Sequence, residues 1–350
     1  MKVLYAIQGT GNGHLSRAKD VIPALMKRVN VDVMISGIQA DLELPFSIKY
    51  RYHGLSFIFG KSGGVDIWNT FKKNQTKRLI KEIKECPVQE YDLVINDFEP
   101  VSAWACKIKG VKCISLSHQA SLRSKNVPKP DHSDWMGSLV LKYYAPCHDY
   151  YSFHFKKYDD QMFTPVIRQE VRDQQVIEGE HYTVYLPAYG DDKIVKVLSK
   201  VKEAQWHVFS KHSKKAYQLE NVKIQPISGT EFSESLASSQ GVLCGAGFET
   251  PAEALFLKKK LMVIPMKKQY EQHFNAEGLK DLGVPVIKKL NKKNLDKIKK
   301  WVESGKKVEV DFPDQTQFIV DELLTTHITT MGEEIRKMEF AIPAFSPKAS

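Results

Sequence analysis

Residues 241–265 read GVLCGAGFETPAEALFLKKKLMVIP, a strand, a glycine turn, a helix and a second strand. The apolar residues 241–244 and 261–264 are typical of buried parallel strands. Pro251 suits the first turn of a helix, where its missing N–H leaves no hydrogen bond unmade. Free N–H groups at a helix start, reached past glycines, bind anions, so the stretch predicts a phosphate cradle.

Three polar residues follow this cradle in the next helical segment. Glu271, Gln272 and Asn275 have the spacing of neighbours on one helix face. Side chains of this kind are suited to binding hydroxyl groups. A phosphate cradle with hydroxyl-binding residues beside it predicts a nucleotide-sugar as the ligand.

The composition is that of a globular protein with basic surfaces. A length of 350 residues favours two domains. With 51 Lys and Arg against 41 Asp and Glu, the net charge is +10. This charge favours phosphates, anionic lipid headgroups or nucleic acid, although a lysine-rich solvated surface explains it equally well. No RNA- or DNA-binding motif is present, and we expect no nucleic-acid partner.

Five cysteines with no C-x-x-C spacing predict neither a disulfide framework nor a zinc site. Reduced, buried thiols are typical of a cytoplasmic protein. The apolar run at the N-terminus is too short for a signal peptide, and no run approaches the roughly 18–20 residues of a membrane span. We expect a cytoplasmic protein, with peripheral contact at the inner face of the cell membrane as an open alternative.

The N-terminal half begins with a strand at 2–7, a glycine turn at 9–14 (GTGNGH), a helix at 15–29 and a strand at 31–36. This order predicts a doubly wound sheet that binds ligands at the carboxyl ends of its strands. The turn matches neither the dinucleotide fingerprint nor a Walker loop, each of which needs glycine where His14 stands. His14 lies at the mouth of the sheet, as a structural cap or as a base.

Asp97 ends the apolar strand 91–97 and is expected at the same sheet edge as His14. A carboxylate beside an imidazole fixes its tautomer and stabilises its charged form, although Asp97 could equally cap the next helix. His118, at the end of a third strand, is a weaker candidate.

Two stretches between these strands allow alternative interpretations. The basic helix predicted at 68–85 is either an ordinary surface helix, which we prefer, or a contact for the acceptor or a membrane surface. The aromatic, irregular stretch 121–160 either packs between layers or forms an acceptor groove. A second α/β pattern begins near 182, which gives domains at 1–165 and 181–330, a linker at 166–180, and a tail at 331–350 that could return to the first domain.

Several of these stretches together resemble one family. The cradle, the strand after it, and residues 271–276 (EQHFNA) resemble the donor-binding signature of GT-B glycosyltransferases. The branch holding the lipid-II-forming N-acetylglucosaminyltransferase and the UDP-glycosyltransferases is the most similar, and the turn at 9–14 resembles its N-terminal glycine loop. Residues 96–100 (NDFEP) and the segment around Arg168 are similar to bacterial and archaeal members. The resemblance implies an α/β fold of two Rossmann-like, doubly wound parallel-sheet domains facing a central cleft.

The resemblance also implies donor-binding roles. Glu253 would hold the ribose hydroxyls, and Phe232 would line the base. Glu271 and Gln272 would contact sugar hydroxyls, with Asn275 supporting their loop. Four consecutive residues would bind the diphosphate through backbone N–H groups: Gly247, Phe248, Glu249 and Thr250.

On the acceptor side, the resemblance makes His14 the general base and Asp97 its helper. The glycine loop and a third strand end would complete the acceptor site: Gly11, Asn12, Gly13 and His118. A UDP-sugar is the expected donor, the acceptor is unknown and could be lipid-linked, and single displacement predicts inversion. No Asp-x-Asp pair is present, so we expect neither a metal nor a cofactor.

Two other function classes remain open. A nucleotide-sugar 2-epimerase or hydrolase on the same fold would need acid/base residues near the sugar, such as Asp97, Glu99 or His273. A nucleic-acid-binding module would need the aromatic and basic residues of 121–160 to form a groove, and is the weaker alternative.

Overall fold

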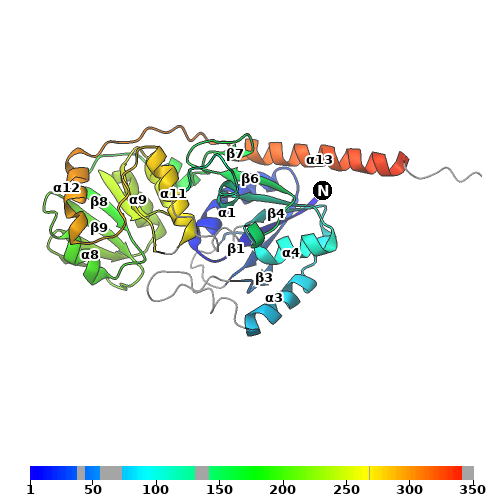
Figure 1. Ribbon diagram of the computed structural model, residues 1–350, viewed down its shortest axis with the longest axis horizontal. Helices are drawn as coiled ribbons and strands as arrows, with labels where there is room; N and C mark the ends of the chain where they lie inside the picture. Colours follow the sequence, from blue (N-terminus) through cyan, green and yellow to red (C-terminus); the bar gives the residue numbers. More distant parts are fainter. Residues whose placement is uncertain (38–43, 56–72, 131–141, 268, 341–350) are drawn as a thin grey trace, which may run out of the picture.

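The computed structural model describes residues 1–37, 44–55, 73–130, 142–267 and 269–340. Two mainly parallel sheets lie next to each other along the long axis of the molecule, each with helices on its faces (Figure 1). This confirms the expected α/β fold of two Rossmann-like domains.

The first sheet has the strand order β3-β2-β1-β4-β5-β6-β7, and its pairs are all parallel. In the register, Ile7 of β1 lies opposite Asp97 of β4, so the loops after these strands are neighbours. The strands are β1 Lys2–Gln8, β2 Asn30–Ser36, β3 Ile48–Tyr52, β4 Leu93–Asp97, β5 Cys113–Ser117, β6 Asp149–Phe153 and β7 Met162–Phe163.

The helices of this domain include α1 Asn12–Met26, α3 Lys73–Glu85, α4 Pro100–Lys109 and α5 His118–Ser121. Helix α1 begins three residues earlier than the sequence predicts. Gly11, at φ 100°, occupies the N-cap position, so the turn ends there and His14 lies in the first helical turn. The described part of the predicted basic helix is α3, and residues 68–72 lie outside the described residues.

The second sheet has the order β10-β11-β9-β8-β12-β13, with one antiparallel edge pair, β10 with β11. Its strands are β8 His181–Tyr185, β9 Gln205–Ser210, β10 Tyr217–Leu219, β11 Val222–Pro226, β12 Gly241–Gly245 and β13 Lys260–Ile264. Its helices include α8 Asp191–Leu198, α9 Gly229–Ser238, α10 Glu249–Phe256, α11 Tyr270–Asp281 and α12 Leu295–Ser304.

The aromatic stretch 121–160 is more ordered than the sequence indicates. It contains β6, whose Tyr151 and Phe153 are buried in the core, and the buried Phe155 follows. Their described positions agree with packing between layers. Residues 131–141 of this stretch lie outside the described residues. The predicted linker contains a short helix, α7 Gln169–Arg172.

The chain returns to the first domain through α13, Thr316–Phe340, which lies along α1 (Figure 1). Arg28, just after α1, donates two hydrogen bonds, of 2.7 and 2.6 Å, to the carboxylate of Asp321. Leu323 and Ile319 add buried apolar contact. The return therefore begins well before residue 331, the start of the tail that the sequence suggests. Residues 341–350 lie outside the described part of the chain. No described helix is long and apolar enough to cross a bilayer.

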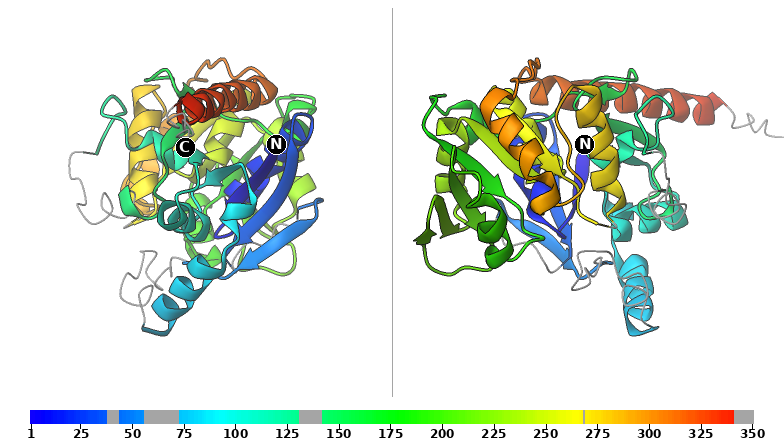
Figure 2. Two further views of the ribbon diagram at one scale, coloured as in Figure 1. Left: turned by 90° about the vertical axis from the view of Figure 1, so that its right-hand side faces the viewer. Right: turned by 60° about the vertical axis from the view of Figure 1, so that its left-hand side comes forward.

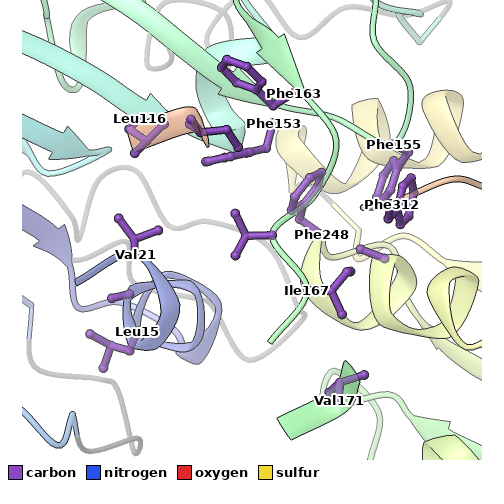
Figure 3. Close-up of a cluster of buried hydrophobic side chains, with 14 of the residues drawn as sticks. Leu15, Val21, Leu116, Phe153, Phe155, Phe163, Ile167, Val171, Phe248 and Phe312 are labelled. Atoms are coloured by element: carbon purple, nitrogen blue, oxygen red, sulfur yellow. The ribbon is translucent and has the colours of Figure 1, made fainter. Parts of the chain in front are cut away.

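One hydrophobic core runs through both domains. Leu15 of α1, Phe155 after β6 and Phe248 at the start of α10 belong to the same buried cluster (Figure 3). The ring centroids of Phe155 and Phe248 are 4.8 Å apart. This packing places the N-terminus of α10 against the carboxyl edge of the first sheet.

Candidate active site

His14 and Asp97 form a buried pair at the carboxyl edge of the first sheet. His14 Nδ1 lies 2.9 Å from Asp97 Oδ1. Phe98, directly after Asp97, has φ 54°, a left-handed conformation that non-glycine residues adopt mainly where surroundings enforce it. Its ring stacks on Tyr144 at 4.7 Å. The carboxylate of Asp97 contacts His14 and Arg17 of α1, and α4 is capped by Glu99 instead of by Asp97.

Arg17, one helical turn after His14, completes this pair. Its Nη2 donates to both oxygens of Asp97, at 2.7 and 2.8 Å. Its Nη1 donates to Oε1 of Glu249, at 2.5 Å, across the domain boundary. Arg17 is 1% exposed. A single guanidinium thus links the His14–Asp97 pair to Glu249, the first residue of α10.

The charged neighbours of Asp97 keep its carboxyl group ionised in spite of its burial. Burial raises the pKa of this carboxyl, but the charges of Arg17 and His14 outweigh burial, and the pKa is lowered. Burial lowers the pKa of Arg17, and Asp97 and Glu249 reverse that shift and raise it. Asp97 therefore stays ionised and acts as an acceptor toward both partners.

Gln119 bridges the two domains beside His14. Its Nε2 lies 3.2 Å from His14 Nε2 and 3.1 Å from Glu271 Oε2, which belongs to α11 of the second domain. Gln119 is 3% exposed and His14 8%. The His14 ring is thus enclosed in this structure, with an amide at the ring nitrogen that faces the second domain.

His118 also faces Glu271 and the second domain. Its Nε2 lies 2.8 Å from Glu271 Oε1, at ion-pair distance but without a well-directed hydrogen bond. Its ring stacks on Phe248, with centroids 4.6 Å apart and planes 9° apart. Burial lowers the pKa of His118, with Glu271 opposing. For Glu271, burial raises the pKa, but His118 and Gln119 overcome it and bring the pKa down to about 2. Glu271 is thus a carboxylate at neutral pH.

The predicted phosphate cradle lies between β12 and α10. The N-cap of α10 makes no side-chain hydrogen bond, so its first N–H groups are not capped. A Cβ built on Gly247 would have no atom within 4 Å, which leaves open space above the turn. A pocket at this edge is lined by residues of β8, β12, the glycine turn, α10 and α11, among them Tyr185, Gly245, Gly247, Thr250 and Gln272.

Two α11 side chains hold the walls of this pocket. Asn275 Nδ2 donates to the carbonyl oxygen of Ala246, at 3.2 Å, inside the glycine turn. Gln272 Oε1 accepts from the backbone N–H of Met266, at 2.9 Å. The fold therefore uses both residues to shape the loops around the cradle. Phe232, on α9, packs edge-on against Tyr185 at 5.5 Å, and Tyr185 lines the pocket.

The acidic residues of α10 are both engaged. Glu253, 3% exposed, accepts from Arg168 Nε and Nη2, at 2.5 and 2.9 Å. Arg168 also pairs with Glu170. Burial raises the pKa of Glu249 to about 8, with Arg17 opposing. A ribose at Glu253 would have to share the carboxylate with Arg168.

Glu99 has a structural role in the residues described. Its two oxygens accept from the backbone N–H groups of Val101 and Ser102, each at 2.6 Å, which caps α4. Ser36 donates to the same carboxylate at 2.5 Å. With its oxygens occupied and 0% exposure, Glu99 is poorly placed for the acid/base role that an epimerase would need.

No role was predicted from the sequence for Arg17, Gln119 or Arg168. For Arg17 a signal existed, because its i+3 spacing from His14 puts both residues on one helix face. Gln119 directly follows His118 at a strand end, which is also visible. Their partners are Glu249, Glu271 and Glu253, which lie far away in the sequence, so the sequence gives no signal for these pairings. Among the residues described, no group of three or more His, Cys, Asp or Glu side chains could hold a metal ion.

The comparisons with known proteins agree with this architecture. MurG of Acinetobacter baumannii has the same fold, with a TM-score of 0.54 and 13% identity over 93% of this chain and 99% of the other. Phytolacca americana UGT2, complexed with UDP-2-fluoro-glucose and pterostilbene, has a TM-score of 0.56 and 13% identity over 92% of this chain and 93% of the other. The spinosyn forosaminyltransferase SpnP has a TM-score of 0.54 and 13% identity over 93% of this chain and 99% of the other.

No curated protein sequence matches the chain. At 13% identity, the structural similarity establishes the fold alone, and it confirms the GT-B architecture. The family model described as glycosyl transferase family 1 matches residues 1–304, most of the chain. The chain therefore belongs to glycosyl transferase family 1 and is a glycosyltransferase.

Proposed function

We propose that this glycosyltransferase moves a sugar from a nucleoside-diphosphate sugar to an acceptor hydroxyl with inversion. The acceptor oxygen forms a bond to the anomeric carbon while the bond from that carbon to the diphosphate breaks. The hydroxyl proton passes to His14 Nε2, and the nucleoside diphosphate leaves. The observation that carries the proposal is the buried His14–Asp97 pair, held across the domain boundary from the cradle of α10.

The hydrogen bonds around His14 favour the tautomer that a base requires. Ionised Asp97 only accepts, so Nδ1 of His14 carries the proton and donates to it. Nε2 is then free to accept a proton, and Asp97 stabilises the imidazolium that forms. In this tautomer the 3.3 Å approach of Arg17 Nη2 to Nδ1 joins two donors and is not a hydrogen bond.

The donor is proposed to bind over the second sheet. The uncapped N–H groups of Phe248, Glu249 and Thr250, and the positive end of α10, would stabilise the charge that develops on the leaving diphosphate. The open space above Gly247 admits the phosphates. Phe232 and Tyr185 would line the site of the nucleotide base, and Glu253 would bind the ribose. Glu271 and Gln272 would bind the transferred sugar. These roles need neither a metal nor a cofactor.

A UDP-sugar is the first candidate donor, because UGT2, which shares the fold, is complexed with UDP-2-fluoro-glucose. Calorimetric titration with UDP, GDP, dTDP and their sugars tests this choice. We expect one nucleotide to bind clearly more tightly than the others. If none of them binds, the proposed function is wrong.

Incubation of the preferred donor alone separates transfer from the alternative functions. A 2-epimerase converts the donor to a new sugar isomer, and a hydrolase releases free sugar rapidly without an acceptor. A transferase needs an added acceptor for rapid turnover. Proton NMR of the first-formed product then gives the anomeric configuration, and retention would contradict single displacement.

We further propose that α3 contacts an anionic membrane surface at the inner face of the cell membrane, where a lipid-linked or cell-envelope acceptor would be reached. Figure 2 shows α3 projecting from the body of the first domain. Lys77, Lys81 and Lys84 are exposed on it beside Ile80, which is 49% exposed. Basic helices of this kind bind anionic headgroups, and salt weakens the attraction.

Co-sedimentation with phosphatidylglycerol vesicles tests this contact. We expect salt-sensitive binding by the native chain and its loss when Lys77, Lys81 and Lys84 are changed together to Glu. Binding that the triple change leaves intact would exclude α3 as the contact.

A further inference from the structure

The amide of Gln119 occupies the position that an acceptor hydroxyl needs. Glu271 is ionised and only accepts, so Gln119 Nε2 is the donor in their 3.1 Å contact. The second hydrogen of the same amide then points to His14 Nε2, 3.2 Å away, which accepts it. A hydroxyl that gives up its proton must approach the same Nε2 to about 2.6–3.2 Å. The amide and the acceptor therefore exclude each other.

The surroundings of Gln119 contain polar atoms that the protein leaves unpaired. Among the described residues, Gln119 Oε1 and His118 Nδ1 are buried without a hydrogen-bond partner, whereas His118 Nε2 lies 2.8 Å from Glu271 Oε1. Buried polar atoms normally have partners, so a cluster of unpaired ones beside a base indicates a place for ligand hydroxyls. Both side chains are more than nine-tenths buried, at 3% and 5% exposure.

We infer that Gln119 is a positioning residue that closes the base until substrates arrive, and so keeps water from hydrolysing the donor. The inference rests on the proposed function, because it uses the same base and the same sugar-binding carboxylate. When sugar hydroxyls engage Glu271, Gln119 loses one of its two partners. It then turns aside and leaves Nε2 to the acceptor.

Hydrolysis without this closure would follow the same chemistry as transfer. The oxygen of water would bond to the anomeric carbon, the bond to the diphosphate would break, and the proton would pass to His14. Free sugar and nucleoside diphosphate would be the products. An enzyme that leaves its base open to water wastes its donor, and exclusion of water limits that reaction.

Acylation by diethyl pyrocarbonate measures how open the base is, because the reagent attacks accessible unprotonated imidazole nitrogens. We compare Gln119→Met, which keeps the length of the side chain without its N–H groups, with Gln119→Ala and the native chain. Peptide mass spectrometry follows His14, and the exposed His212 of the second domain is the internal reference. Thermal unfolding tests whether each variant is folded. If one of them is not, Gln119→Asn takes its place.

We expect the reagent to acylate His14 about tenfold faster or more, relative to His212, in both variants. They lack the amide that is hydrogen-bonded both to His14 and to the charged Glu271 and so covers the ring. It also predicts that release of free sugar from the preferred UDP-sugar rises about tenfold without acceptor. If Gln119→Met protects His14 as well as the native residue does, Gln119 only fills space and the inference is wrong. If the native chain binds no nucleotide-sugar, the proposed function fails, while the acylation result still decides whether Gln119 covers the base.

Discussion

The carboxyl edge of the first sheet presents charged side chains that pair with one another, whereas the same edge of the second sheet presents glycines and uncapped backbone N–H groups. At the first edge, His14, Asp97 and Arg17 are all under 10% exposed, and His14 and Arg17 both bond to Asp97. At the second, the space above Gly247 is open. The side chains of the first edge are hydrogen-bonded within the protein, whereas the second edge offers backbone N–H groups to a ligand.

This difference has a physical reason. A base must keep one tautomer at a fixed place, and buried ion pairs supply that rigidity. A diphosphate brings its own charge, and backbone N–H groups at a helix start bind it without a buried cation. Substitutions at the first edge should therefore affect stability and rate together, while those at the second should affect donor binding alone.

The largest effect is expected for Asp97→Asn. An amide keeps the size of the side chain but no longer fixes the tautomer or stabilises the imidazolium, so transfer should fall roughly 10²–10⁴-fold. Steady-state kinetics with the preferred donor measure the change in kcat. Since Asp97 does not touch the cradle, donor affinity should stay the same, and an unchanged kcat would remove Asp97 from the mechanism.

Arg17→Met should destabilise the fold by about 3–5 kcal/mol, because it leaves the fully buried carboxylate of Asp97 without its cation. Urea unfolding monitored by tryptophan fluorescence gives the free energy. Arg28→Met is the matched control, since its pair with Asp321 is largely exposed and should contribute under about 1 kcal/mol. Equal losses in the two variants would contradict the buried network.

Gly247→Ala should weaken nucleotide binding by about tenfold or more while leaving stability within about 0.5 kcal/mol. The added methyl group meets no protein atom, but it enters the space that the phosphates need. Gly190→Ala is the control, because a Cβ there also has no atom within 4 Å and the residue lies outside the pocket. Calorimetry with the preferred nucleotide distinguishes them, and unaltered affinity in Gly247→Ala would place the phosphates elsewhere.

The last prediction concerns acid stability. The pKa of Glu271 falls from its ordinary value of 4.5 to about 2 in the folded chain, so the folded state favours the ionised form. This contribution is present above pH 4.5 and is lost as the pH falls toward 2, on the order of 1–3 kcal/mol. Urea unfolding between pH 3 and 7 should show a steeper acid loss for the native chain than for Glu271→Gln. Parallel curves would contradict the pairing of Glu271 with His118 and Gln119.

The parts of the site that local sequence encodes were predictable. The glycine cradle at 241–250, the glycine turn before His14 and the strand end at Asp97 follow from periodicity and turn chemistry, which act over a few residues. The bridges between domains were not predictable, because Gln119 and Glu271 are 152 positions apart and only the packed fold joins them. Strand β6 was missed because its tyrosines and serine hide the apolar pattern of a buried strand.

The most direct test of the account measures donor binding and donor turnover on one variant, His14→Ala. The account places the base on the first sheet and the donor on the second. Nucleotide affinity should therefore stay within about twofold, while release of nucleoside diphosphate in the presence of acceptor falls roughly 10²–10⁴-fold. Retained turnover, or loss of donor binding together with activity, would contradict the division of the site between the two sheets.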